Sequence, residues 1–268
     1  MSGARRSLLA RRELAFALVR RDLSAPFAGS AFGVAWALLH PLIQTVVYVA
    51  VFTLIFRLRF GEAEAGRLDA ATYMVAGLIS WMSWATALIA GCNAVTGNAS
   101  LVRQADFPAE VLPLKTVLVA LVQQSVMVVV LLLYVLVRFG RPDWTWVLLP
   151  VAAVVQGLAM VGAASLLAAL CVYLRDAREV VTVAVGIGLY LTPAFYLPSM
   201  VAGFPEPLRW LLLLNPFTHF MNVWRDCLFW GEIAHPASWV LASMFAAASW
   251  LFGRRAFDRL KSHFGNFV

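Results

Sequence analysis

Apolar stretches as long as a lipid bilayer is thick recur along the whole sequence. A helix needs roughly 18 or more mostly apolar residues to cross the hydrocarbon core, and several runs reach that length. Hydrophobic residues make up 62% of the 268 residues, charged residues only 13%, and the mean hydropathy is +0.81. The chain is therefore expected to be an integral membrane protein, and a single all-α bundle can use its whole length.

Six transmembrane helices are predicted, at 32–56, 71–97, 114–137, 145–172, 180–197 and 237–252. The last two stretches are shorter than the others. Together the spans form one domain, residues 32–268, which follows a cytoplasmic segment, residues 1–31. That first segment is too long and too rich in arginine for a simple signal peptide, and no small-residue cleavage site follows it.

The distribution of Lys and Arg predicts which face is cytoplasmic. Fourteen of the 21 basic residues fall on one face, which comprises residues 1–31, the connections 98–115 and 173–179, and the C-terminal tail. The 14 acidic residues divide equally, so this face carries a net charge of +7 and the other carries none. Because basic connections remain in the cytoplasm, both termini are expected there. The basic excess is thereby assigned to a membrane face, and no nucleic-acid partner is expected.

Residues 198–236 form the least regular part of the pattern. Two apolar pieces, "PLRWLLLLNPF" and "HFMNVWRDCLFW", have only 11 and 12 residues and are too short to span. Joining them into one span would bury Arg209, Arg225 and Asp226 and would place the basic tail outside. We therefore expect two short re-entrant helices in the outer, periplasmic leaflet between spans five and six.

The N-terminal segment is predicted to be an amphipathic helix. Leu9, Phe16 and Leu23 recur every seven residues and place one apolar stripe along it. Such a helix can lie in the cytoplasmic headgroup layer. A simpler alternative is a basic anchor that only sets the orientation. The candidate contacts with lipid headgroups are Arg11, Arg12, Arg20 and Arg21.

Several classes of function are disfavoured by what the sequence lacks. Apart from Lys115 at the edge of the third span, the six predicted spans contain no Asp, Glu, Lys or Arg, whereas ion-coupled carriers normally place ionisable groups deep in the membrane. The chain has no phosphate-binding G-x-x-x-x-G-K-[ST] loop, and it shows no spacing typical of a metal or nucleophilic site. Its three cysteines, in odd number and without a CxxC pair, are interpreted as small apolar residues. Energy, if used, must come from a partner.

The stretch "LVRQADFPAEVLPLKT", residues 101–116, is a polar insert between predicted spans two and three. Asp106 can cap a short helix that includes Glu110, with Pro108 at an early position where a missing N–H costs nothing. Pro113 is expected to stop that helix before span three. The result would be a short cross-helix within 101–113 that exposes Phe107 and Val111. An ordinary capped loop fits the same residues.

Three motifs resemble one family. "GNASLVRQADFPAEVLPLKT" resembles the linker of ABC-transporter permeases that export polysaccharides, "RRDLSAPFAGSAFGVAWALLHPL" resembles their N-terminal signature, and "LNPFTHFMNVWRDCLFWG" resembles their C-terminal segment. "YLRDAREV" and "LTPAFYLPS" add to the match, which covers nearly the whole chain in order. The last features are closer to O-antigen and teichoic acid permeases than to the capsule branch.

The resemblance implies a homodimeric permease in the bacterial inner membrane that exports a lipid-linked polysaccharide of O-antigen or capsule type, or alternatively a teichoic acid precursor. Two copies of a separate ATPase would bind ATP and Mg²⁺, so this chain would be no enzyme and would hold no cofactor. The resemblance also implies that the linker forms the coupling helix that docks on the ATPase. Its residues here are Asp106, Phe107, Pro108, Glu110, Val111, Leu112 and Pro113.

Aromatic residues within the spans are candidates for a polysaccharide path. Trp81 and Trp84 share one helix face, and Trp81 lies roughly 15 Å from the start of span two at 1.5 Å per residue, far from an interfacial belt. Such rings can stack on the C–H faces of sugars or simply pack against other helices. The residues that could continue an aromatic lining outward are Tyr190, Phe195, Tyr196, Trp210 and Trp224.

Two other classes of function also fit the sequence. A non-transport scaffold or assembly protein could bind partners through residues 101–113. A membrane-embedded glycan transferase would need converging catalytic groups, whereas the candidate acids are spread over both faces; these are Asp22, Asp106, Asp176, Glu179, Asp226 and Glu232. A neighbouring gene for a soluble ATPase with a phosphate-binding loop would favour transport.

Overall fold

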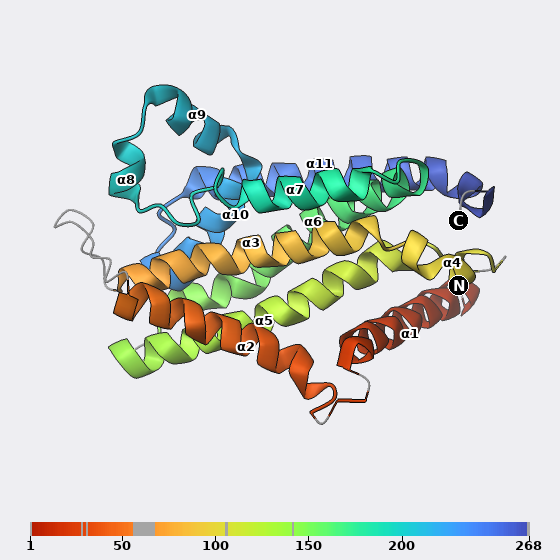
Figure 1. Ribbon diagram of the computed structural model, residues 1–268, viewed down its shortest axis with the longest axis horizontal. Helices are drawn as coiled ribbons and strands as arrows, with labels where there is room; N and C mark the ends of the chain where they lie inside the picture. The colour runs from red at the N-terminus through yellow and green to blue at the C-terminus, as the bar shows by residue number, and fades with distance from the viewer. Residues whose placement is uncertain are drawn as a thin grey trace.

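The computed structural model describes residues 2–27, 29–30, 32–55, 68–104, 107–140 and 142–266. These residues form helices and turns without a strand, in agreement with the all-α prediction. Figure 1 shows the long helices running side by side along the molecule. The start of α1 and the end of α11 lie at one end of this bundle, called here the α1 end, and α8 and α9 project at the opposite end, the α8 end.

Five helical stretches of the described chain are long and apolar enough to cross a membrane. They are α2 (Ala35–Ala50) with its π-helical continuation Val51–Ile55, α3 (Ala70–Cys92), α5 (Val111–Phe139), α6 (Leu149–Tyr173) with the preceding turn Trp144–Leu148, and α11 (Pro236–Leu260). They correspond to predicted spans one to four and six. The last is longer than predicted and continues into a 3-10 turn, Lys261–Asn266.

The predicted fifth span, 180–197, is wrong as a continuous helix. Helix α7 (Ala177–Gly188) has 12 residues, which give about 18 Å at 1.5 Å per residue, short of the roughly 30 Å of hydrocarbon. The chain then turns because Pro193 disfavours helical geometry at Thr192, whose hydroxyl bonds back to the carbonyl of Leu189. Helix α7 nevertheless packs along α3 and carries the chain from the α1 end toward the α8 end (Figure 1).

The segment 198–236 contains three helices where two were predicted. They are α8 (Pro198–Ala202), α9 (Glu206–Leu214) and α10 (Pro216–Arg225), and α10 continues as a π-helical stretch, Asp226–Trp230. Asn215 caps α10 by accepting a hydrogen bond from the N–H of Phe217 at 3.0 Å. Helix α9 is largely exposed, whereas the inner face of α10 is buried against α3 and α11.

Small residues allow α6 and α11 to pack closely. A Cβ atom added to Gly253 would lie 1.9 Å from the carbonyl oxygen of Gly162, and one added to Gly162 would lie 2.2 Å from the backbone of Ser249. The Ser249 hydroxyl donates to the carbonyl of Ala159 at 2.8 Å across this contact. Close backbone approach through glycine and serine is typical of helix pairs in membranes, where the hydrophobic effect does not drive helices together.

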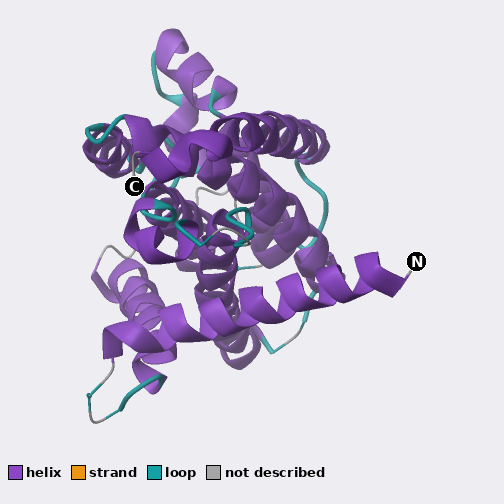
Figure 2. Cartoon of the chain, turned by 90° about the vertical axis from the view of Figure 1, so that its right-hand side faces the viewer, coloured by secondary structure: helices purple, strands orange, loops and turns teal. Residues whose placement is uncertain are grey.

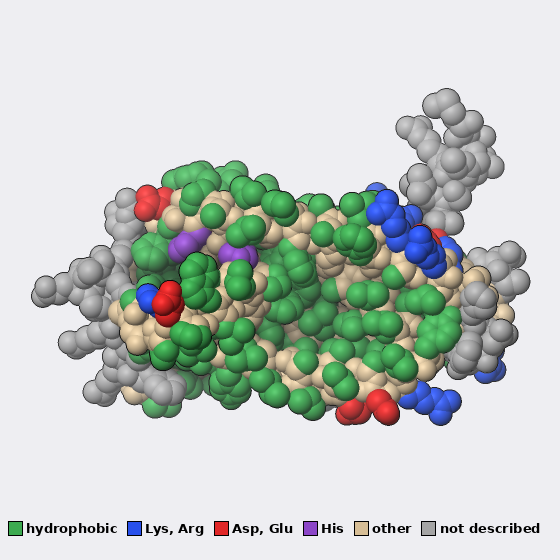
Figure 3. Space-filling model, turned by 90° about the horizontal axis from the view of Figure 1, so that it is seen from above, with side chains coloured by type: hydrophobic (Ala, Val, Ile, Leu, Met, Phe, Trp, Pro, Cys, Tyr) green, Lys and Arg blue, Asp and Glu red, His purple; other side chains and the backbone are tan. Residues whose placement is uncertain are grey.

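The outer surface has the polarity expected of a membrane protein. In the view of Figure 3, apolar side chains cover the middle of the molecule, and the described Lys and Arg gather mainly toward one end. Large apolar side chains on the long helices point outward, among them Val137, Val147 and Phe252, which are 88%, 79% and 69% exposed. An apolar band between charged ends fits a helical bundle embedded in lipid.

Candidate functional site

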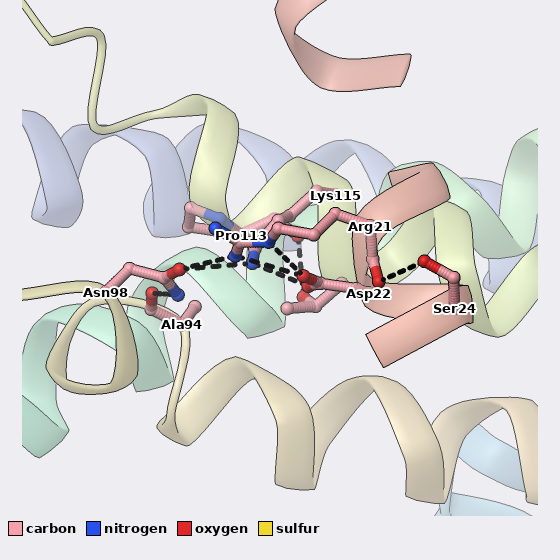
Figure 4. Close-up of polar contacts among 8 residues, drawn as sticks. Arg21, Asp22, Ser24, Ala94, Asn98, Pro113 and Lys115 are labelled. Carbon is pink, nitrogen blue, oxygen red and sulfur yellow. Dashed lines mark hydrogen bonds and ion pairs between the residues drawn. The ribbon is translucent and has the colours of Figure 1, made fainter. Parts of the chain in front are cut away.

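A partly buried ion pair joins α1 (Ser2–Ser24) to the start of α5 at the α1 end. The ammonium Nζ of Lys115 lies 2.5 Å from Oδ2 of Asp22, and the Lys115 side chain is only 3% exposed. Asn98 lies beside the pair: its Oδ1 accepts from Arg21 at 2.9 Å and lies 3.5 Å from the Lys115 ammonium. Figure 4 shows these side chains converging from α1, the α3–α4 connection and α5. The four residues are called the α1–α5 joint.

Helix α1 reaches this position through its apolar face. Figure 2 shows α1 lying across the end of the bundle. Ala15, Leu18 and Val19 are buried, and Asp22 follows them at helical spacing on the same face. Ala15 and Leu18 belong to an apolar cluster that includes Val111 and Leu112 of α5. Packing of this face against α5 therefore presents Asp22 to Lys115.

The N-terminal segment is helical, as predicted. Phe16 of the predicted stripe is 57% exposed, while Ala15, Leu18 and Val19 form the buried face, so contact of the stripe with headgroups stays a prediction. The side chain of Leu9 lies outside the described residues. Arg12 and Arg20 are exposed, and the guanidinium of Arg12 lies 5.6 Å from the Phe16 ring centroid. Arg21 turns toward Asp22 and Asn98. The side chain of Arg11 lies outside the described residues.

The described linker residues, 101–104 and 107–116, do not show the predicted separate cross-helix. Helix α4 (Ala99–Val102) ends within the linker, Ala109–Glu110 form a turn, and α5 begins at Val111. Pro113 does not interrupt α5 because it lies in the first turn, where N–H groups have no intrahelical partner. Asp106, the proposed cap, lies outside the described residues.

The predicted exposure of the linker is also wrong in part. Val111 is 3% exposed and Leu112 is fully buried, while Phe107 is half-buried against the same apolar cluster. Among the described linker residues, Arg103 and Gln104 are exposed. Glu110 lies 3.9 Å from Lys261, which ties the linker to the end of the chain. The linker is thus held from three sides, by α1, by α5 and by the C-terminal turn.

Three of the aromatic residues predicted to line a path are buried inside the bundle. Trp81, Trp84 and Trp224 are 3%, 1% and 3% exposed. The rings of Trp81 and Trp84 pack edge-on against Phe217 at centroid distances of 5.3 and 5.0 Å. Helix packing thus covers all three rings in this conformation, which favours the packing alternative, and their place on a polysaccharide path stays a prediction.

The other aromatic candidates lie nearer the α8 end. Tyr190 and Trp210 are 64% and 55% exposed. Tyr196 and Phe195 are half-buried; the Tyr196 hydroxyl donates to the carbonyl of Tyr190, and the Phe195 ring lies 6.3 Å from that of Tyr190. Only Tyr190 and Trp210 of the predicted set therefore present most of their surface to a ligand.

Arg225 and Asp226 are both fully buried, contrary to the expectation that these charges stay outside the bundle. The Arg225 guanidinium lies 3.9 Å from the Tyr73 ring centroid and donates to the carbonyls of Pro193 and Tyr73. Asp226 accepts from Trp239 and from the backbone N–H of His235, at 3.0 and 3.1 Å. Arg225 fastens α10 to α3, and Asp226 fastens the end of α10 to the start of α11. Hydrogen bonds offset part of the cost of burial, although Nη1 of Arg225 has no hydrogen-bond partner among the described residues. Arg209 is exposed, as expected.

A neutral polar network within the spans was not predicted. Gln156 accepts hydrogen bonds from Ser80 at 3.0 Å and from the indole N–H of Trp224 at 2.5 Å, and its own amide donates to Gln124 at 3.4 Å. The sequence feature that could have indicated this network is the pair Gln123–Gln124, which interrupts an otherwise apolar run.

Other chemistry has little support in the described part of the chain. No three His, Cys, Asp or Glu side chains there come together as a metal site. Cys92, Cys171 and Cys227 are free and buried.

Comparison with known proteins identifies the family. The family described as "ABC-2 type transporter" matches residues 13–229. The O-antigen export system permease protein RfbA of Myxococcus xanthus is 30% identical over 222 residues, which are 82% of each chain. Two Klebsiella pneumoniae proteins with the same name are each 23% identical over the same length and coverage. Because the family match covers most of the chain, this protein belongs to the ABC-2 type transporter family.

Proposed function

We propose that this protein is the permease subunit of an ATP-driven exporter that moves an O-antigen-type polysaccharide, attached to its lipid carrier, across the bacterial inner membrane. The observation that carries the proposal is the match to O-antigen export permeases over 82% of both chains, in a chain with five helices fit to span a membrane. The permease acts without catalytic residues of its own. Two copies of a separate ATPase bind ATP and Mg²⁺, and two copies of the permease enclose the path.

The α1 end is the cytoplasmic end in this proposal, and the ATPase docks on the linker there. The surface available to it includes Arg103, Gln104 and the outer side of Phe107. The α1–α5 joint supports this role, because a displacement of the linker acts at once on α5 through the first turn and on α1 through Asn98 and Lys115. A rigid connection of this kind transmits force from ATP hydrolysis to the spans.

Deleting the gene in its host is expected to abolish display of the surface polysaccharide and to leave lipid-linked glycan inside the inner membrane. Reintroducing the gene should restore display only when the partner ATPase can hydrolyse ATP. The measurement is surface glycan by immunoblot of intact cells, together with glycan extracted from the inner membrane. Unchanged display after deletion would rule out the export role, and the surface polymer that is lost would distinguish O-antigen from capsule or teichoic acid.

The orientation gives a second prediction. Single cysteines at exposed positions 104 and 262 should react with a membrane-impermeant maleimide only after the inner membrane is opened. A cysteine at exposed position 205, between α8 and α9, should react in intact spheroplasts. The natural cysteines are buried and provide a low background. Labelling of position 262 from outside would contradict cytoplasmic termini.

A further inference from the structure

A polar cavity lies among α2, α3 and α5, away from the α1–α5 joint. Its volume is about 390 Å³, within the roughly 300–1,000 Å³ of typical ligand pockets. Six of its lining side chains carry hydrogen-bonding groups; they are His40, Gln44, Ser83, Thr86, Gln123 and Gln124. In hydrocarbon such groups are costly unless they have partners, so their gathering in one cavity needs an explanation.

The cavity lies near the middle of the membrane-spanning helices. Gln123 and Gln124 stand close to the midpoint of α5, and Met82 and Ser83 stand close to the midpoint of α3. A substrate that crosses the bilayer must pass this depth, where it can find few polar partners in lipid.

One side chain of the cavity is buried and incompletely partnered. Gln124 is 2% exposed, and its amide Nε2 has no hydrogen-bond partner among the described residues. Its Oε1 is held by Gln156, which also receives the Trp224 indole. The network thereby holds the carbonyl oxygen of the Gln124 side chain, whereas its amide nitrogen donates to no described residue. This donor needs an acceptor from outside the described side chains, and Gln124 lines both this cavity and a neighbouring one beside Trp224.

The chemistry of the lining selects a neutral, hydroxyl-rich ligand. Glutamine amides and threonine or serine hydroxyls both donate and accept, as sugar hydroxyls do. No Lys, Arg, Asp or Glu lines the cavity, which disfavours the phosphate groups of a lipid carrier, because phosphate sites normally use cationic donors. Neutral hydrogen bonds are individually weak, so a sugar held by them can be released as the chain advances.

We propose that this cavity binds one sugar unit of the polysaccharide while the chain crosses the membrane, with Gln123, Gln124 and Thr86 as hydrogen-bonding residues. The proposal rests on the proposed export function and adds the place where the glycan is held. It assigns the path to neutral side chains of α2, α3 and α5 in place of Trp81 and Trp84. A contact between two permease copies, made through the same polar groups, is the competing explanation.

The first arm of the test measures export. Gln123→Leu and Thr86→Val are introduced separately into the full transporter, with Thr182→Val on α7 as the matched control, because the exposed Thr182 hydroxyl bonds only to its own helix at Arg178. Each cavity variant should lower surface glycan about five-fold, the effect of losing one neutral hydrogen bond, at equal permease level and equal ATPase association. The control should export normally. Normal export by both cavity variants would overturn the proposal.

The second arm locates the glycan directly. A photo-crosslinking residue replaces Gln123 or, as control, the outward-facing Val137, and sugars released by acid from the purified permease are identified by mass spectrometry. Sugar should be recovered from position 123 and not from 137. Cross-linking of position 123 only to a second permease copy would show a dimer contact and overturn the sugar site. Failure of the export function itself would appear separately, as absence of surface glycan with the unmodified gene, and would remove the basis of the proposal.

Discussion

Replacing Trp84 with alanine is expected to deplete the folded permease and to lower export only in proportion. The ring is 1% exposed and packs against Phe217 and Phe220 at centroid distances of 5.0 and 5.2 Å. Removing a large buried ring typically costs about 3–5 kcal/mol. The lower end of that range is expected here, because the unfolded helices remain in lipid and the lost stabilisation is mainly packing. The indole N–H has no hydrogen-bond partner in the described chain, so no polar contact is lost.

The matched control is Trp210→Ala on α9. Its ring is 55% exposed, and its indole makes only a 3.4 Å contact with Glu206, so stability should change little. Thermal unfolding of the detergent-solubilised protein and permease level in the membrane are measured beside surface glycan. A Trp84→Ala variant with unchanged stability and lost export would return this ring to the polysaccharide path.

The spans could be predicted from the sequence because hydropathy over about 19 residues is a local property. Five of the six predicted spans coincide with helices of the structure. The exception, 180–197, is also apolar, and its helix ends at Gly188 because of local turn chemistry around Pro193. Hydropathy measures how well a segment dissolves in lipid and does not show where its helix ends.

The contacts within the bundle could not be predicted in the same way. Periodicity places Trp81 and Trp84 on one helix face, but it does not show that Phe217, more than 130 residues later, covers that face. The burial of Arg225 depends likewise on Tyr73 and on the carbonyl of Pro193, which belong to other elements. Close packing lets a few distant residues decide whether a side chain is exposed or buried.

At the α1 end, the structure of the linker could likewise be predicted only in part from the sequence. Its charge and its two prolines correctly marked a boundary between two spans. The position of Pro113 did not show whether a helix ends or begins there, because proline suits the first turn of a helix and stops one in its interior. The burial of Lys115 depends on Asp22, 93 residues earlier in the chain.

Breaking the ion pair between Lys115 and Asp22 is the second change with a large expected effect on stability. Asp22→Ala should lower the free energy of unfolding by about 3 kcal/mol, because removing one partner of a buried pair leaves the other charge without compensation. The stranded group would be the Lys115 ammonium, which is 3% exposed and would retain only Asn98 at 3.5 Å. Lys115→Met should cost less, since Asp22 is 27% exposed and still contacts Arg21 at 3.1 Å.

A double-mutant cycle completes the test. The double variant Asp22→Ala with Lys115→Met should recover most of the stability lost in Asp22→Ala alone, because no charge is then stranded in the site. Thermal unfolding in detergent measures each variant, with the exposed pair Arg254–Asp258 on α11, at 3.8 Å, as a control whose disruption should change little. A loss in the double variant equal to the sum of the two single losses would mean that Lys115 and Asp22 do not interact. If the joint also transmits force, the stable double variant should still bind the ATPase and hydrolyse ATP while exporting less glycan per ATP, because α1 would no longer follow α5.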